Sequence, residues 1–207
     1  MSKFSEQLIR QLSNFWEIST EEIEIIISYE DNVLQKCKCC FKRVDNKYYN
    51  SGEINLAHSG QWLTFLYYFS NTLYHNQHFG LADKVYYLNK VMHGADIFYS
   101  VDLPEVFFFE HPVGSVFGKA HYGKNFFAMQ NCTVGGNRDR ITGEINYPTI
   151  GNNVKMYSGS KILGKATIGN DVVLAANTYV KNETIPDGAT VFGQSPNLII
   201  KYIKYGY

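Results

Sequence analysis

From Ile150 to Ile185 the sequence reads Ile150-Gly-Asn-Asn-Val-Lys, Met156-Tyr-Ser-Gly-Ser-Lys, Ile162-Leu-Gly-Lys-Ala-Thr, Ile168-Gly-Asn-Asp-Val-Val, Leu174-Ala-Ala-Asn-Thr-Tyr and Val180-Lys-Asn-Glu-Thr-Ile. The first residue of each unit is a large aliphatic residue or methionine, and the fifth is small or β-branched. Gly, Asn or Asp falls between them, where tight turns require a positive φ or a side-chain–backbone hydrogen bond. The stretch therefore predicts consecutive repeats of six residues.

A period of six residues predicts a coil of triangular cross-section. Each unit supplies one short strand and one corner, so three units complete a turn. The aliphatic residue points inward and stacks on its equivalents, and each coil pairs its backbone with the next. An α-helix needs a period of about 3.6 residues, and a sandwich strand alternates with a period of about two. A parallel β-helix is therefore the architecture that fits.

The chain before Gly94 has a helical pattern instead. A stripe of apolar residues runs at helical spacing from Phe4 to Trp16. Ser19-Thr20-Glu21-Glu22 predicts a capping box, in which Ser19 caps a helix and Glu22 reaches back. Further helices are expected over 62–74 and 81–92, with a loop over 46–59. The fold is therefore predicted to be mainly β with an α-helical N-terminal domain over 1–93, a parallel β-helix over 94–200 and a tail over 201–207.

The composition excludes some functions. Lys+Arg and Asp+Glu both number 19 among the 207 residues, and this balance argues against a nucleic-acid or anionic-membrane surface. The first residues do not read as a signal peptide, and the apolar run at 62–69 is too short for a membrane span, so we expect a cytoplasmic protein. Cys37, Cys39 and Cys40 are expected to be reduced thiols on a helix, because no second ligand pair for zinc follows them. No metal is expected.

The second half of the chain resembles the hexapeptide-repeat acyltransferases, and among them the serine O-acetyltransferases. Its motifs occur in order at matching spacing: Gly94-Ala-Asp-Ile, Phe109-Glu-His, Thr133-Val-Gly-Gly, Ser158-Gly-Ser-Lys-Ile-Leu-Gly, and Ile185-Pro with 193–196. The resemblance implies a left-handed coil, an N-terminal helical domain and transfer of an acetyl group from acetyl-CoA.

Acetyl transfer to an alcohol requires a base, and histidine suits this role. Of the six histidines, only His111 falls at the family's catalytic position, so the resemblance implies that it is the general base. Glu110 takes the place of the family's aspartate, and would orient the imidazole or contact the acceptor. The alternative is a coil histidine exposed by chance.

The resemblance also implies where CoA binds, in a groove between two neighbouring prisms. The contacts would fall at Ser158, Gly159, Ala176, Lys181 and Asn182, and Lys201 would meet the 3′-phosphate. Small side chains would let the pantetheine arm lie close, whereas a solvated surface remains the alternative for the lysines. Gly135 and Gly136 are candidate oxyanion donors, or else simply coil corners. Because the groove needs two prisms, a homotrimer or a dimer of trimers is expected.

Residues 137–149 interrupt the repeat, and in the family a loop here helps to cover the neighbouring subunit's active site. Serine acetyltransferases have Arg-His-Pro in this stretch, whereas this chain has Asn146-Tyr147-Pro148. Asn146 cannot form a charged bidentate pair with a carboxylate, and Tyr147 suits stacking on a sugar or on CoA.

Three hypotheses follow. The first is an acetyl-CoA-dependent O-acetyltransferase that acts on a sugar hydroxyl of a cell-surface polysaccharide or its precursor. The second is a serine O-acetyltransferase of cysteine synthesis, whose C-terminal tail commonly ends in isoleucine, whereas this sequence ends Lys204-Tyr-Gly-Tyr. The third is a β-helix without catalytic activity that serves as an assembly scaffold.

Overall fold

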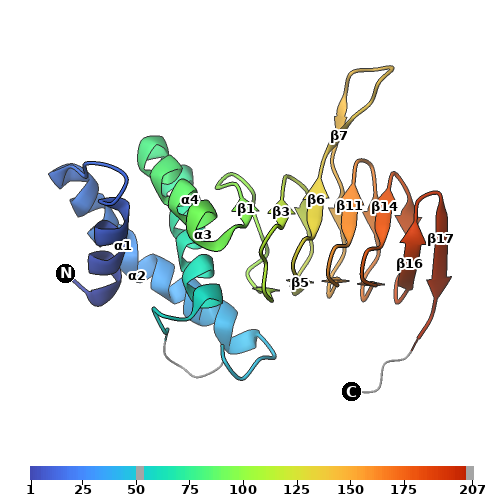
Figure 1. Cartoon of the computed structure of the whole chain (residues 1–207), viewed down its shortest axis with the longest axis horizontal. Coiled ribbons are helices and arrows are strands. Elements are labelled where there is room, and N and C mark those ends of the chain that lie inside the picture. Colours follow the sequence, from blue (N-terminus) through green and yellow to red (C-terminus); the bar gives the residue numbers. More distant parts are fainter. Residues whose placement is uncertain (50–53, 204–207) are drawn as a thin grey trace. The chain divides into compact units, whose positions relative to one another are not determined.

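The computed structural model describes residues 1–49 and 54–203. They fall into two compact units, Met1–His93, which is helical, and Gly94–Tyr207, which is built from short strands (Figure 1).

The helical unit contains α1 (Lys3–Leu12), α2 (Thr20–Arg43), α3 (Ser59–His75) and α4 (Phe79–His93). The predicted capping box is confirmed at the start of α2, where Ser19 Oγ accepts from the Glu22 N–H and Glu22 Oε2 accepts from the Ser19 N–H, both at 3.1 Å. The predicted helices over 62–74 and 81–92 are α3 and α4.

Two of the helical predictions need correction. The stripe from Phe4 to Trp16 was too long, because α1 ends at Leu12 and a tight turn follows, in which the Phe15 N–H donates to the Leu12 carbonyl at 3.0 Å. Trp16 packs edge-on against Tyr87 instead, with ring centroids 5.4 Å apart. The predicted loop over 46–59 includes residues 50–53, which lie outside the described residues, and its last residue, Ser59, already begins α3.

The core of the helical unit is centred on α3, which is buried along most of its length. Trp62 stacks on Phe65 with ring centroids 4.7 Å apart, and donates its indole N–H to Gln11 Oε1 of α1 at 2.9 Å. Each such buried aromatic side chain stabilises the fold by about 1.5–3 kcal/mol.

Cys37, Cys39 and Cys40 are free thiols on α2, as predicted. Burial raises the pKa of the Cys37 thiol well above its ordinary value, so it stays protonated. Over residues 1–49 and 54–203, no group of three or more His, Cys, Asp or Glu side chains is arranged to hold a metal ion. Among the described helices, none is long and apolar enough to cross a bilayer.

The second unit is a left-handed parallel β-helix with three faces. The first face consists of β1 (Asp96–Ile97), β3 (Val116–Phe117), β6 (Thr133–Gly135), β11 (Lys161–Leu163) and β14 (Tyr179–Lys181). The second consists of β2 (Phe107–Phe109), β5 (Phe126–Ala128), β10 (Lys155–Met156), β13 (Val173–Leu174) and β16 (Thr190–Gln194). The third consists of β4 (His121–Tyr122), β9 (Thr149–Ile150), β12 (Thr167–Ile168) and β15 (Thr184–Ile185).

Each coil passes from the second face to the first, then to the third, and turns at three edges. The His111 edge joins the second face to the first, and comprises residues 110–115, 129–132, 157–160 and 175–178. The loop edge joins the first face to the third, and comprises residues 118–120, 136–148, 164–166 and 182–183. The ladder edge joins the third face to the second, and comprises residues 123–125, 151–154, 169–172 and 186–189.

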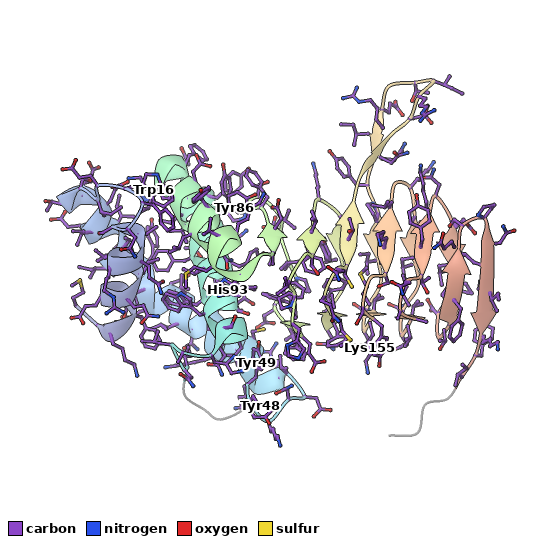
Figure 2. The ribbon with its side chains drawn as sticks, viewed as in Figure 1. Trp16, Tyr48, Tyr49, Tyr86, His93 and Lys155 are labelled. Atoms are coloured by element: carbon purple, nitrogen blue, oxygen red, sulfur yellow. The ribbon has the colours of Figure 1, made fainter. Side chains whose placement is uncertain are left out.

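The pairing register confirms the six-residue period. Thr149 pairs with Thr167, Lys155 with Val173 and Lys161 with Tyr179, in each case one coil of three units further along the chain. The residues predicted to point inward are at most 2 % exposed: Ile150, Met156, Ile162, Ile168, Leu174 and Val180. By contrast, Lys155 is exposed on the outside of β10 (Figure 2).

The sixth unit was predicted with one residue too many. Thr167 pairs with Thr184, so only two residues, 182 and 183, turn the corner where three, 164–166, turn it one coil earlier. Both corners begin with a residue of positive φ, Asn182 at 58° and Gly164 at 67°. Because the corner is one residue shorter, Thr184, expected at a fifth position near a tight corner, is exposed, and Ile185 takes the inner position.

The coils before Ile150 have an aromatic core. Phe109 lies parallel to Phe117, with ring centroids 4.3 Å apart and an interplanar angle of 3°. Phe126 meets Phe117 edge-on at 5.9 Å. These rings fill the same interior column as the aliphatic residues of the later coils.

The last coil is covered by a hairpin. β17 (Asn197–Lys201) runs antiparallel to β16, with Lys201 opposite Thr190. The strand extends one residue into the predicted tail over 201–207, of which residues 204–207 lie outside the described residues.

Candidate active site

Glu110 and His111 lie in a widened corner of the His111 edge. Phe109 pairs with Ala128 and Val116 with Thr133, so six residues, 110–115, turn the corner where four, 129–132, turn it in the next coil. The Glu110 N–H still donates to the Ala128 carbonyl at 2.9 Å, and the chain leaves the register after that bond. The two extra residues form a bulge in the coil at His111, the predicted general base.

His111 has an unusual backbone conformation, with a φ of 52°. Outside glycine such a conformation costs on the order of 1–2 kcal/mol. The His111 carbonyl accepts from the Val113 N–H at 2.7 Å, which fixes the bulge. The His111 side chain is exposed, and neither it nor the half-buried Glu110 forms a side-chain hydrogen bond within the described part of the chain. The imidazole is therefore accessible to a substrate, and no hydrogen bond from Glu110 orients it here.

The same edge carries three of the predicted CoA contacts. Three backbone bonds join the coils at this edge. The Asn131 N–H donates to the Val113 carbonyl at 3.0 Å, the Gly159 N–H donates to the Gln130 carbonyl at 2.8 Å, and the Asn177 N–H donates to the Ser158 carbonyl at 2.9 Å. These bonds stack Ser158, Gly159 and Ala176 in the coils beyond His111, along one edge. Gly159 has a φ of 74°, which favours glycine, and a Cβ there would displace the Asn177 side chain. The structure thus places these residues along one edge, with Ser158 and Gly159 two coils beyond His111 and Ala176 three coils beyond it.

Four further candidates of the coil lie at the loop edge or directly before it: Gly135, Gly136, Lys181 and Asn182. Gly135 pairs with Leu163, and Leu163 with Lys181, at the ends of β6, β11 and β14. A Cβ on Gly136 would lie 2.8 Å from the Tyr147 ring, so glycine lets the loop fold back on the coil. Asn182 Oδ1 accepts from the Lys165 N–H at 2.8 Å. The first face separates these residues from His111 within one chain.

A hairpin leaves the coil at the loop edge (Figure 1). It consists of β7 (Asn137–Arg138) and β8 (Ile145–Asn146), which pair antiparallel. At its tip Asp139 Oδ1 accepts backbone N–H bonds from Ile141 at 2.8 Å and Thr142 at 2.9 Å. These two hydrogen bonds, with the bond from Thr142 contributing most, lower the pKa of Asp139.

A pocket of about 580 Å³ opens beside the base of this hairpin. The Tyr147 ring lines it, and the Lys119 ammonium lies over this ring, 5.0 Å from the centroid. Asp102 and His121 also contribute to the wall. Lys119 and Asp102 were not singled out from the sequence. Strand register could have identified Lys119. His121 pairs with Thr149, so the residues two positions earlier, Lys119 and Tyr147, lie next to each other.

Comparison with known proteins relates these features to a family. The family model described as bacterial transferase hexapeptide (six repeats) matches residues 147–182. A serine acetyltransferase of Helicobacter pylori (strain ATCC 700392 / 26695) is 27 % identical over 153 residues, which cover 73 % of this chain and 88 % of the relative. The chain thus carries the hexapeptide repeat over these residues and is similar to serine acetyltransferases over most of its length.

Solved structures of serine acetyltransferases share the fold of this acyltransferase. The Neisseria gonorrhoeae enzyme matches with a TM-score of 0.73 and 19 % identity, over 99 % of this chain and 82 % of that one. A serine acetyltransferase in complex with CoA matches with a TM-score of 0.71 and 20 % identity, over 95 % and 82 % of the two chains.

Lys201 lies apart from both groups of candidates in this acyltransferase. Its partner Thr190 directly follows the ladder edge, and the Lys201 ammonium lies over the Phe192 ring, 5.8 Å from the centroid. The structure therefore does not bring Lys201 next to Ser158 or Lys181 within one chain.

Three histidines of the helical unit, His58, His78 and His93, lie beside polar groups of that unit. His58 Nδ1 accepts from the Gln61 N–H at the start of α3, and His78 lies 3.3 Å from the Tyr29 hydroxyl. His93 is buried at the end of α4 (Figure 2), and its Nδ1 lies 2.7 Å from Asn89 Oδ1. Burial lowers the pKa of His93.

Proposed function

We propose that this acyltransferase moves the acetyl group of acetyl-CoA to the hydroxyl of serine, with His111 as the general base. The observation that carries the proposal is the exposed imidazole at the bulged corner, on the same edge as Ser158, Gly159 and Ala176. The sequence favoured a sugar hydroxyl as acceptor, but the relatives support the alternative, because those found by sequence and by fold are serine acetyltransferases.

The chemistry assigned to His111 is proton transfer in both directions. Its free ring nitrogen takes the hydroxyl proton as the oxygen attacks the thioester carbonyl carbon. The tetrahedral intermediate then expels the CoA sulfur, which receives the same proton from the imidazolium. The products are an O-acetyl ester and CoA thiol. The backbone N–H groups of Gly135 and Gly136 are the proposed donors to the oxyanion, and Glu110 is proposed to contact the acceptor.

The residues of the His111 edge fit the pantetheine arm of CoA. Ser158, Gly159 and Ala176 present small side chains, so an extended chain can approach the backbone. The side-chain oxygen of Gln130, one coil beyond His111, is buried and has no hydrogen-bond partner in the described part of the chain. A serine acetyltransferase of the same fold has been solved with CoA.

The complete site is proposed to form between copies of the chain. His111 lies on one edge, whereas Gly135, Gly136, Asn146, Tyr147, Lys181 and Asn182 lie at or beyond the other side of the first face. A homotrimer, or a dimer of trimers, would set the loop edge of one prism beside the His111 edge of the next. Lys201 is proposed to meet a CoA phosphate only within such an assembly.

One experiment separates the three hypotheses. Thiol release from acetyl-CoA is measured with serine, with nucleotide sugars and with glycan oligomers as acceptors. Thiol release that occurs only with serine supports the proposal. Thiol release that occurs only with the sugar acceptors supports the polysaccharide alternative, which the neutral Asn146-Tyr147 pair favours. An assembly scaffold releases no thiol with any of them. His111→Ala should fold normally and lose nearly all transfer, and turnover near that of the wild type would refute the role of His111.

A further inference from the structure

We infer that Ser115 is a positioning residue for His111, because its hydroxyl bridges the two ends of the turn that supports the His111 bulge. The inference rests on the proposed function and adds to it a residue that acts through His111 without touching the substrate. Every residue in it belongs to the β-helical unit, Gly94–Tyr207.

The Ser115 hydroxyl makes two hydrogen bonds to the next coil. Ser115 is the last residue of the widened corner and is 1 % exposed. Its Oγ donates to the Met129 carbonyl at 3.0 Å and accepts from the Cys132 N–H at 3.0 Å. The hydroxyl therefore lies between the first and the last residue of the turn 129–132. It satisfies one buried acceptor and one buried donor of a coil that is not its own.

The two later turns of the same edge are closed directly by their backbone. The Ser160 N–H donates to the Tyr157 carbonyl at 3.0 Å, and the Thr178 N–H donates to the Ala175 carbonyl at 3.1 Å. Of these three turns, 129–132 is the one whose ends are joined through a side chain. It is also the turn in the coil directly beyond His111.

The bridge depends on a hydroxyl at this position. The pairing of β3, β6, β11 and β14 sets Ser115, Cys132 and Thr178 in one column, with Ser160 between the last two. The Cys132 thiol donates to the Tyr157 carbonyl at 3.3 Å, and the turn 157–160 nevertheless keeps its direct bond. A thiol is the weaker donor and acceptor, so it does not replace a backbone bond as a hydroxyl does.

The bridged turn supports the His111 bulge. The Asn131 N–H donates to the Val113 carbonyl at 3.0 Å, and the Asn131 side chain lies against Gly114, where a Cβ would overlap its Oδ1. The Val113 N–H donates in turn to the His111 carbonyl at 2.7 Å. Contacts thus run without a break from Ser115, through the turn, to the backbone of His111.

The position of this backbone matters for catalysis because the His111 side chain forms no hydrogen bond within residues 94–203. A general base must lie within hydrogen-bond reach of the proton that it takes, and a displacement of about 1 Å can cost on the order of a hundredfold in rate. Without the Ser115 hydroxyl, the Cys132 N–H can bond directly to the Met129 carbonyl, as at the later turns. The support of the bulge would then shift, and His111 with it.

The test measures thiol release from acetyl-CoA with serine as acceptor. Ser115→Ala and Ser115→Cys should lower kcat at least about tenfold, whereas the KM values for serine and acetyl-CoA should change less than about twofold. Ser115→Thr keeps the hydroxyl, and Thr178 shows that the column accommodates threonine, so its kcat should stay within about threefold of the wild type. Thr178→Val is the matched control, because it removes a buried hydroxyl that donates to the Val191 carbonyl at 3.0 Å. Its kcat should stay within about twofold of the wild type.

These variants separate positioning from a general loosening of the coil, and the melting temperature of each is measured alongside. A wild-type kcat in Ser115→Ala would overturn the inference, whatever the melting temperature. A loss in Ser115→Thr or in Thr178→Val as large as that in Ser115→Ala would overturn it as well. If Ser115→Ala does not fold, Ser115→Cys, which fills the same space, takes its place.

A nuclear magnetic resonance measurement distinguishes failure of this inference from failure of the proposed function. The ring Cε1–H resonance of His111, assigned by its absence from His111→Ala, requires no turnover. It should shift in Ser115→Ala and stay in place in Thr178→Val. If the wild type transfers nothing to serine, the proposed function fails and this resonance decides the inference. An unshifted resonance in Ser115→Ala would then overturn the positioning role too.

Discussion

Asn153 and Asp171 occupy equivalent corners of neighbouring coils, and the Asn153 side-chain amide donates to Asp171 Oδ1 at 2.8 Å. Both residues have a positive φ, of 57° and 56°. Asn125 continues the series one coil earlier by donating to Asn153 Oδ1 at 2.8 Å. The ladder edge is thus joined from coil to coil by side chains, in addition to the backbone pairing of the faces.

Replacing Asn153 should separate the two contributions of this ladder. Asn153→Ala loses both side-chain bonds and strains the left-handed backbone, so we expect it to cost about 1–3 kcal/mol. Asn153→Gly loses the bonds but tolerates the backbone, and should cost less. Urea denaturation of both proteins checks this, with Lys124→Ala as the control. Equal losses for the two variants would show that the positive φ carries no cost here.

The shortened corner before β15 predicts a difference between two positions of the repeat. Ala166 is 1 % exposed, whereas Thr184, at the same position by sequence counting, is exposed. Ala166→Arg should bury a charge and prevent folding or lower stability by several kcal/mol, because the coil interior offers no partner. Thr184→Arg should change stability by no more than about 0.5 kcal/mol. Circular dichroism melts of the two proteins test the assignment, and similar losses would contradict it.

The proposal that active sites form between copies predicts complementation. His111→Ala chains, and chains whose hairpin 138–145 is replaced by two glycines, should each be inactive alone. Mixed trimers contain interfaces where an intact His111 meets an intact loop edge, and random mixing should restore about a quarter of the wild-type activity. Mixtures formed by co-expression and assayed for thiol release test this. A mixture that stays inactive would place both elements in the site of one chain.

His93 predicts how the stability of the helical unit depends on pH. Burial lowers its pKa from the ordinary value of 6.5. The unfolded chain therefore takes up a proton that the folded chain excludes, so the stabilisation is complete above pH 6.5 and is lost as the pH falls toward the lowered value. His93→Gln removes this titration and should flatten the dependence of the urea midpoint on pH between about 8 and 5.5. His121→Gln, at an exposed position, should leave the dependence as in the wild type.

The period of six residues predicted the later coils because one inner position per unit dominates their sequence. Ile150, Met156 and Ile162 repeat without interruption, so counting alone sets their faces. In the earlier coils the inner positions hold Phe109, Phe117 and Phe126, and their spacing is irregular, since the corner at His111 has two extra residues. Counting could not extend the frame there.

The site was predictable only in part for a related reason. Motifs pointed to His111, Ser158 and Gly159, and the stacking of coils places these residues on one edge. Lys119 belongs to no motif, and it lies over the Tyr147 ring because the pairing of β4 with β9 sets the two residues side by side. Only the register across the interruption reveals that meeting.

The hairpin of β7 and β8 leaves and rejoins the coil without disturbing it, since β4 still pairs with β9 across the interruption. Its side chains contribute little to the interior column, so the coil can fold whatever the hairpin's length or composition. Under the proposed function, selectivity for the acceptor would therefore be separable from folding. Exchanging this hairpin between related acyltransferases should then change which ester is formed and leave the β-helix intact.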